Sequence, residues 1–194
     1  MDAPARAFIA IFPPADVAAE IARAVAPRRI RGDGIAWVRE RNLHFTLRFL
    51  GALSPVEVAA AGRALAAAAG APGVEPVGVR LAGPGVFPGP ARPRVLWLGA
   101  AASAAGLVHL AAAVETALER EGFAPSDRPF TPHLTLGRVR DPEHVAPDTV
   151  PGFLAAAFPA ADFLADTIVL AGSTLAPGGS IYQTLAQAKL GGGT

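Results

Sequence analysis

Residues 42–49 read Asn-Leu-His-Phe-Thr-Leu-Arg-Phe, and residues 131–138 read Thr-Pro-His-Leu-Thr-Leu-Gly-Arg. Both stretches contain His-x-Thr-Leu, and the two histidines, His44 and His133, lie 89 positions apart. The chain has only four histidines and nine threonines, so chance rarely produces such a repeat. We therefore interpret the repeated motif as a functional signal.

The spacing of the motif has a structural meaning if each copy lies on a strand. Positions i and i+2 of a strand point to the same face, about 6.5–7 Å apart. Each strand then presents an imidazole beside a hydroxyl: His44 with Thr46, and His133 with Thr135. The residues between them face the opposite way, into a core. Two such strands brought together would place two histidines and two threonines around one cleft.

Two facing imidazoles can divide acid and base work near pH 7, one neutral and one protonated. Hydroxyl groups beside them can donate hydrogen bonds to anionic oxygens. This set of groups favours displacement at phosphorus, with water deprotonated on one side and an alkoxide leaving group protonated on the other. Nothing in the arrangement requires a metal, and the residues alone leave open which histidine is the acid.

Other readings of the histidines are weaker. A single histidine on a strand is usually structural, but that reading does not explain a matched pair. A metal site built on His44 and His133 lacks further ligands at typical spacing, and His-Glu-x-x-His is absent. A Ser-His-Asp triad lacks the Gly-x-Ser-x-Gly elbow. We predict structural or surface roles for His109 and His144, and neither a metal nor a cofactor.

Several arginines flank the motifs. Strand parity places Arg48 on the His44 face, where it could contact phosphate, and Arg138 on the opposite face unless a bulge intervenes. Arg128 leads into the second motif and is our additional candidate for substrate binding.

Two further features are plausible RNA contacts. Arg92 and Arg94 lie in a stretch rich in Gly and Pro and could clamp an RNA backbone. Aromatic residues near these segments could stack on a terminal base or belong to the core. They are Trp37, Phe49, Phe87 and Phe130.

Composition limits the class of protein. The chain has 194 residues and is 52% hydrophobic, but 44 of its residues are alanine, and no apolar run is long enough to span a membrane. We expect no signal peptide, no membrane association, and a cytoplasmic monomer. The absence of cysteine excludes disulfides, iron–sulfur clusters and a cysteine nucleophile. A net charge of +1 argues against a protein that coats nucleic acid.

Hydrophobic periodicity predicts an α+β fold with antiparallel strand pairs in one domain, residues 1–194. Ser54 and Glu57 form a capping signature, and Leu107, Leu110 and Val114 have helical spacing. Strands are expected at 6–12, 35–38, 42–50, 77–81, 95–98, 133–139, 167–170 and 181–186, and helices at 14–26, 54–69 and 103–121. The stretch 83–94 and the Pro-rich stretch to 159 are expected to be loops, and 190–194 a flexible tail.

These motifs and their surroundings resemble the 2H phosphoesterases, most closely the bacterial and archaeal RNA 2′,3′-cyclic phosphodiesterases once called 2′-5′ RNA ligases. The resemblance covers almost the whole chain. Besides the two motifs it rests on residues 6–14, Trp37-Val38, Phe49-Leu-Gly51, 85–88, 92–97, 128–136 and 173–182. One departure is Ala52, where an acidic residue often follows the Leu-Gly of the first motif.

The resemblance implies a bilobal fold, in which two related ferredoxin/RRM-like α+β lobes with antiparallel sheets surround a central cleft. It also implies metal-independent hydrolysis of 2′,3′-cyclic phosphates, on RNA ends or nucleotides, to 2′-phosphomonoesters. On this analogy His44 donates a proton to the leaving 3′ oxygen and His133 activates water. Thr46 and Thr135 would hold the nonbridging phosphate oxygens.

Two alternatives stay open. One is another activity of the same superfamily, such as hydrolysis of a small cyclic phosphate like that of ADP-ribose, or reversible 2′-5′ joining of RNA. The other is a non-catalytic module that binds RNA ends. The presence of all four histidine and threonine residues argues against the second, because binding alone does not require two titratable imidazoles.

Overall fold

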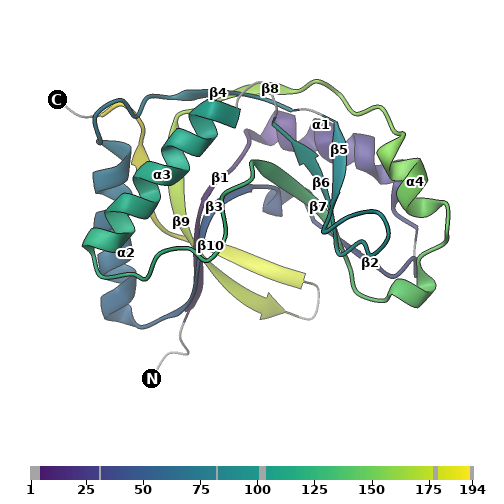
Figure 1. Cartoon of the computed structure of the whole chain (residues 1–194), viewed down its shortest axis with the longest axis horizontal. Coiled ribbons are helices and arrows are strands. Elements are labelled where there is room, and N and C mark those ends of the chain that lie inside the picture. The colour runs from purple at the N-terminus through teal and green to yellow at the C-terminus, as the bar shows by residue number, and fades with distance from the viewer. Residues whose placement is uncertain (1–4, 31, 82, 101–103, 177–178, 193–194) are drawn as a thin grey trace.

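The computed structural model describes residues 5–30, 32–81, 83–100, 104–176 and 179–192 (Figure 1). Its helices are α1 (Ala15–Val25), α2 (Pro55–Ala69), α3 (Ala104–Arg120) and α4 (Thr149–Leu154), with short 3-10 turns η1 (Ala26–Arg28), η2 (Glu40–Asn42) and η4 (Pro142–His144). Its strands are β1 (Ala5–Ile11), β2 (Ile35–Trp37), β3 (Phe45–Leu53), β4 (Val77–Arg80), β5 (Pro84–Phe87), β6 (Val95–Gly99), β7 (His133–Val139), β8 (Asp162–Ala165), β9 (Thr167–Ala176) and β10 (Gly179–Lys189).

One large sheet runs through the molecule in the order β10-β9-β1-β3-β7-β6-β5, and β2 pairs with β7. All of its pairs are antiparallel. In the described chain β3 and β7 pair only through Phe45 and Leu134. This narrow join divides the sheet into two lobes, so the predicted bilobal α+β fold with antiparallel strands is confirmed. A separate two-stranded sheet joins β4 to β8.

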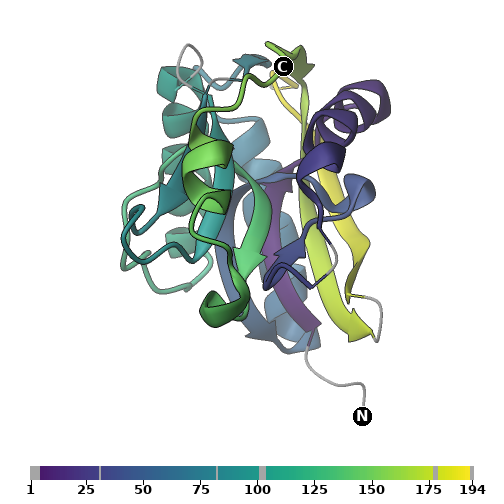
Figure 2. The same cartoon turned by 90° about the vertical axis from the view of Figure 1, so that its right-hand side faces the viewer.

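The helices cover the sheet at opposite ends. Helices α2 and α3 pack on each other, α2 covers β10 and β9, and α3 contacts β3. Helix α4 contacts β5 at the other end of the molecule (Figures 1 and 2). The predicted apolar stripe of α3 is confirmed, since Leu107, Leu110 and Val114 are at most 1% exposed. The predicted cap of α2 is also present: Ser54 Oγ accepts from Glu57 N–H, and the Glu57 carboxylate accepts from Ser54 N–H at 2.7 Å.

Three loop or tail predictions were wrong in part. Pro84–Phe87 forms β5, which is an edge strand and therefore tolerates a proline at its start. The stretch before 159 contains η4 and α4, and β8 follows it. Leu190 is buried and its N–H donates to Asp166 O at 2.8 Å, so the packed chain extends into the expected tail. Residues 193 and 194 of that tail lie outside the described residues.

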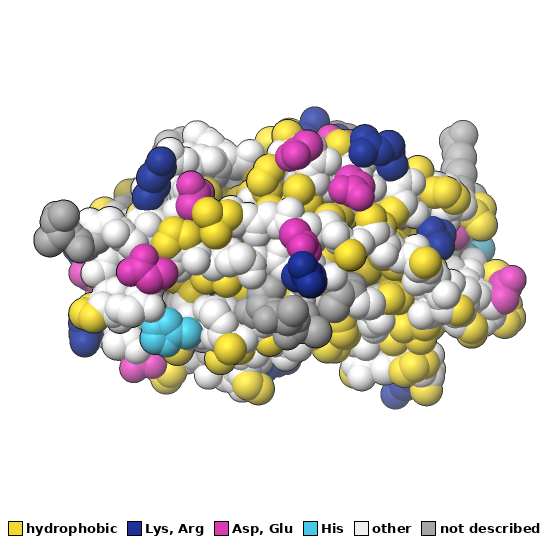
Figure 3. Space-filling view, turned by 90° about the horizontal axis from the view of Figure 1, so that it is seen from above, with side chains coloured by type: hydrophobic (Ala, Val, Ile, Leu, Met, Phe, Trp, Pro, Cys, Tyr) yellow, Lys and Arg dark blue, Asp and Glu magenta, His cyan; other side chains and the backbone are white. Residues whose placement is uncertain are grey.

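The described helices include none that is long and apolar enough to cross a membrane. The face shown in Figure 3 carries charged side chains of both signs between apolar ones.

Candidate active site

The two motifs meet where the lobes join. Phe45 lies opposite Leu134, and both side chains are fully buried. In an antiparallel pair this register places His44 beside Thr135 on one side and Thr46 beside His133 on the other. Because side chains alternate along each strand, these four polar residues share the face opposite the buried pair. The structure therefore brings the two predicted histidines and two predicted threonines together.

Each histidine is held by a backbone carbonyl two residues before it. His44 Nδ1 lies 2.7 Å from Asn42 O, and His133 Nδ1 lies 2.7 Å from Thr131 O. A carbonyl oxygen only accepts, so Nδ1 carries the proton in both neutral rings, and Nε2 has a free lone pair. Asn42 is itself anchored, because its Nδ2 donates to Ser180 O at 2.7 Å. Both motifs thus present the same nitrogen for proton transfer.

Burial makes both imidazoles weak bases in the unliganded protein. It lowers the pKa of His44 to about 4, although the Asn42 carbonyl partly opposes the shift. The positive charge of Arg138 and the presence of His133 lower the pKa of His44 further. The pKa of His133 is also lowered by burial and by Arg138, against the effect of the Thr131 carbonyl. Both rings are therefore neutral at pH 7 in the protein alone.

Aromatic side chains cause much of the burial of His44. Its ring centroid lies 4.8 Å from that of Phe8, 5.5 Å from Phe12 and 5.4 Å from Tyr182. Burial also raises the pKa of Tyr182, so its hydroxyl stays protonated at neutral pH. Local sequence patterns do not link these three residues to His44, because Phe8 lies on β1, Phe12 directly follows it and Tyr182 lies on β10, and they reach His44 only through the sheet order.

His133 has a different aromatic neighbourhood on its own lobe. The Phe87 ring stands edge-on to it at 5.0 Å, and the Trp97 ring lies at 6.3 Å. Of the aromatic residues considered from sequence, Phe87 is therefore near a motif histidine. Trp37 instead donates from Nε1 to Asp33 Oδ2 at 2.8 Å and packs against the core.

The prediction for Arg138 was wrong because β7 contains a bulge. Trp97 lies opposite Thr135 while Leu96 lies opposite Gly137, so Leu136 is an extra residue. The bulge reverses the alternation and brings the Arg138 charge near both histidines. An isolated glycine inside a strand often marks a bulge, so Gly137 was the signal that could have revealed it.

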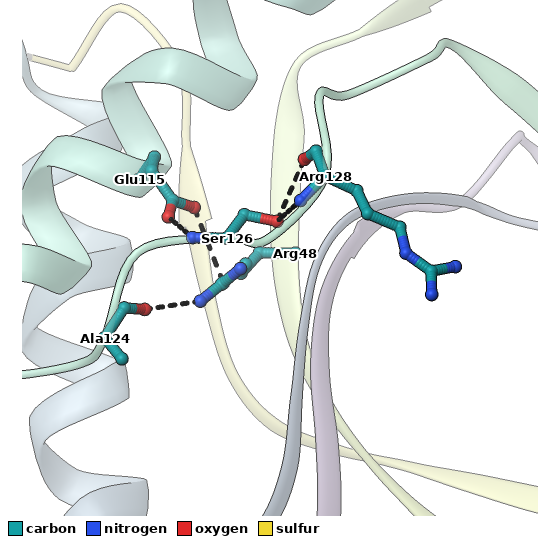
Figure 4. Close-up of polar contacts among 5 residues, drawn as sticks. All are labelled: Arg48, Glu115, Ala124, Ser126 and Arg128. Carbon is teal, nitrogen blue, oxygen red and sulfur yellow. Dashed lines mark hydrogen bonds and ion pairs between the residues drawn. The ribbon is translucent and has the colours of Figure 1, made fainter.

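A second bulge changes the position of Arg48. Ile9 lies opposite Arg48 and Ala10 opposite Thr46, so Leu47 is the extra residue and the parity on which our prediction rested is broken. The Arg48 guanidinium turns to α3, where Nε lies 3.4 Å from a Glu115 carboxylate oxygen (Figure 4). The expectation that Arg48 shares the His44 face is therefore wrong.

Arg128 lies at the edge of a groove that starts at the motifs. The groove has a volume of about 1010 Å³ and runs from Thr46 and His133 along α3 and the segment 125–131. The Arg128 side chain is 86% exposed, and its Nε lies 3.7 Å from Asp127 Oδ2. Figure 4 shows it directed away from Glu115. Its role in substrate binding stays a prediction.

Arg92 and Arg94 line another groove, of about 620 Å³, together with Val139, Val150 and Leu154. Neither motif contributes to the lining of that groove. In the described part of the chain, His, Asp and Glu side chains form no cluster of three that could hold a metal ion.

Known proteins are similar to this chain in sequence and in fold. The model of the 2′-5′ RNA ligase superfamily matches residues 13–174. An RNA 2′,3′-cyclic phosphodiesterase of Thermotoga maritima is 30% identical over 189 residues, which cover 97% of each chain. One of Aeropyrum pernix is 39% identical over 103 residues, 53% of this chain and 56% of that protein. The crystal structure of E. coli LigT complexed with 3′-AMP is 29% identical, with a TM-score of 0.72 and coverage of 97% of this chain and 99% of that one.

Proposed function

This chain belongs to the 2′-5′ RNA ligase superfamily, and we propose that it hydrolyses 2′,3′-cyclic phosphates at RNA ends to 2′-phosphomonoesters by two-histidine catalysis without a metal. One observation carries the proposal. Two histidines with the same free nitrogen, each beside a threonine hydroxyl, share one face at the junction of β3 and β7. This is the set of groups needed to move a proton on each side of a phosphorus atom.

In the proposed reaction, one Nε2 removes a proton from water as its oxygen attacks phosphorus. The bond between phosphorus and the 3′ oxygen breaks, and the other Nε2–H gives its proton to that oxygen. The phosphate stays on the 2′ oxygen. The two histidines exchange protonation states in the step, and proton exchange with water restores them.

We assign the base to His133 and the acid to His44. The groove that opens to solvent is lined by His133, which favours access of water to that ring. His44 lies among Phe8, Phe12 and Tyr182, where a proton donor is shielded from water. The bound phosphodiester is an anion, and its charge raises the pKa of the adjacent imidazole. His44 can therefore be protonated in the complex although its pKa is about 4 in the free protein.

The threonines and one arginine complete the proposed site. Thr135 is 9% exposed and Thr46 is half-buried, so their hydroxyls can bind nonbridging oxygens with little competition from water. Arg138 supplies a positive charge near both histidines. In the absence of substrate the positive charge of Arg138 opposes protonation of the two imidazoles. When the substrate is bound, the negative charge of its phosphate balances that of Arg138.

The test is turnover of 2′,3′-cyclic nucleotides in the presence of a chelator. We expect full activity of the wild type, and a loss of about 10²–10⁴ in kcat for His44→Ala and for His133→Ala. His109→Ala is the matched control, because His109 lies on α3 and lines a different groove, and it should retain activity. Full activity in either motif variant, or loss of wild-type activity on chelation, would exclude the mechanism.

A further inference from the structure

The segment between α3 and β7 forms one side of the groove at the site. Residues 122–132, all within the described chain, form no helix or strand. The segment carries Arg128 and, near its end, Thr131, whose carbonyl holds His133. It also forms a wall of the groove that begins at Thr46 and His133. Its position therefore needs contacts that regular secondary structure does not supply.

Arg48 and Glu115 supply two of these contacts. Arg48 Nη2 donates to Ala124 O, and Ser126 N–H donates to Glu115 Oε1 (Figure 4). The ion pair between Arg48 and Glu115 links the two contacts. Within the segment, Ser126 Oγ donates to Arg128 O at 3.0 Å. The first motif's strand and α3 are thus joined to the chain that leads into the second motif.

This ion pair is partly buried, and its arginine is less exposed than that of a surface pair. The side chains of Arg48 and Glu115 are 14% and 24% exposed. In the pair between Arg63 and Glu121, 2.6 Å apart, the arginine is 63% exposed and the glutamate 26%, so the two pairs differ in their arginines. Fully exposed pairs contribute little to stability, while loss of Arg48 would leave the Glu115 charge partly shielded from water and without its partner. The Arg48–Glu115 pair therefore fixes the position of the segment that it contacts at Ala124 and Ser126.

The groove next to this pair suits an uncharged group. Its volume of about 1010 Å³ is at the upper end of the roughly 300–1,000 Å³ typical of ligand pockets. The two arginines that line it, Arg48 and Arg128, each have an acidic partner. Phe49, which is 53% exposed, and the half-buried Phe130 both line the groove. One face of the Phe49 ring is covered by the Arg6 guanidinium at 5.7 Å and Phe130 packs against the core, so each ring leaves only part of its surface for a base. These features favour a ribonucleoside over a second phosphate.

We propose that Arg48 and Glu115 are positioning residues that hold the segment 124–128 as the wall of a ribonucleoside site, which continues from the phosphate site. This inference rests on the proposed function, because the nucleoside is the one that carries the cyclic phosphate. The chemistry at phosphorus does not require the wall. Loosening the wall should therefore weaken binding of the nucleoside and leave the proton transfers largely intact.

The test compares Arg48→Met and Glu115→Gln with the control Arg63→Met, which breaks the exposed pair on α2 and α3. Kinetics are measured on 2′,3′-cyclic AMP and on the cyclic phosphate of propane-1,2-diol, which has no nucleoside. For Arg48→Met we expect KM for cyclic AMP to rise about tenfold with kcat within about twofold. Arg48→Lys, which keeps the positive charge near Glu115 but not both contacts of the guanidinium, should restore only part of the loss. The diol substrate and the control should show no change.

Hydrogen exchange at the Ser126 amide tests the wall without any substrate. We expect exchange about tenfold faster in Arg48→Met than in wild type, and unchanged exchange in Arg63→Met. Unchanged exchange in Arg48→Met would refute the positioning role, even if the enzyme is active. Equal effects on the two substrates would refute the nucleoside site. If wild type turned over neither substrate, the proposed function would fail and the nucleoside site with it, whatever the exchange result.

Discussion

Replacing His44 with glutamine should change how the stability of the protein depends on pH. Between pH 6.5 and about pH 4, an unfolded chain protonates this histidine, whereas the folded protein keeps it neutral among Phe8, Phe12 and Tyr182. The unfolded state then binds more protons, so the free energy of unfolding falls as pH decreases through this window. Glutamine does not titrate, and its amide can still donate to Asn42 O.

The lowered pKa sets the size of the effect. A shift from 6.5 to about 4 corresponds to about 3 kcal/mol once pH is below both values, because each unit of pKa is worth about 1.4 kcal/mol. Near pH 7 the contribution is close to zero, and near pH 4.5 about 2 kcal/mol of it is expressed. Wild type should therefore lose about 2 kcal/mol more than His44→Gln between these two pH values.

Urea unfolding of both proteins near pH 7 and pH 4.5 measures this difference, and groups common to the two proteins cancel. His133→Gln should give a change of the same sign, since the pKa of His133 is also lowered. The reasoning would be refuted if the difference in free energy of unfolding between wild type and His44→Gln stayed constant with pH. It would mean that His44 has an ordinary pKa and that the aromatic pocket does not keep it neutral.

Three substitutions test other parts of the site. Arg138→Gln should raise the pKa of both His44 and His133, moving the kcat/KM profile as a whole to higher pH, and should raise KM about tenfold. Thr135→Val should reduce kcat/KM about a hundredfold with thermal stability retained, and unchanged kinetics would remove Thr135 from the site. Gly85→Ala should cost about 1–3 kcal/mol in urea unfolding, because a Cβ there overlaps the Trp97 ring; an unchanged midpoint would show that the ring can move.

The parts of the site that follow from local alternation were predictable. His44 and Thr46 share a face because the strand is regular around Phe45, and the second motif repeats this pattern around Leu134. The same rule failed at Arg48 and Arg138, since each lies just beyond a bulge. A bulge depends on how neighbouring strands pair, so parity counted along one strand does not detect it.

Features of the site that depend on segments distant in the sequence could not be predicted from local sequence patterns. The aromatic surroundings of His44 come from β1, the residue that follows it and β10, which become its neighbours only in the folded sheet. The glycines and prolines of 84–87 predict a loop, yet this stretch forms strand β5, and Gly85 is the position where the Trp97 ring needs space. In contrast, the α3 stripe and the Ser54 cap are local signals, and both were predicted correctly.

The product formed from an RNA with a 2′,3′-cyclic phosphate end decides whether two histidines open this ring. With a chelator present, we predict that wild type leaves only a 2′-phosphate, and that neither His44→Ala nor His133→Ala forms product at a comparable rate. A 3′-phosphate product would show that the other bond breaks, and product formation by either variant at the wild-type rate would show that the paired histidines do not carry the reaction.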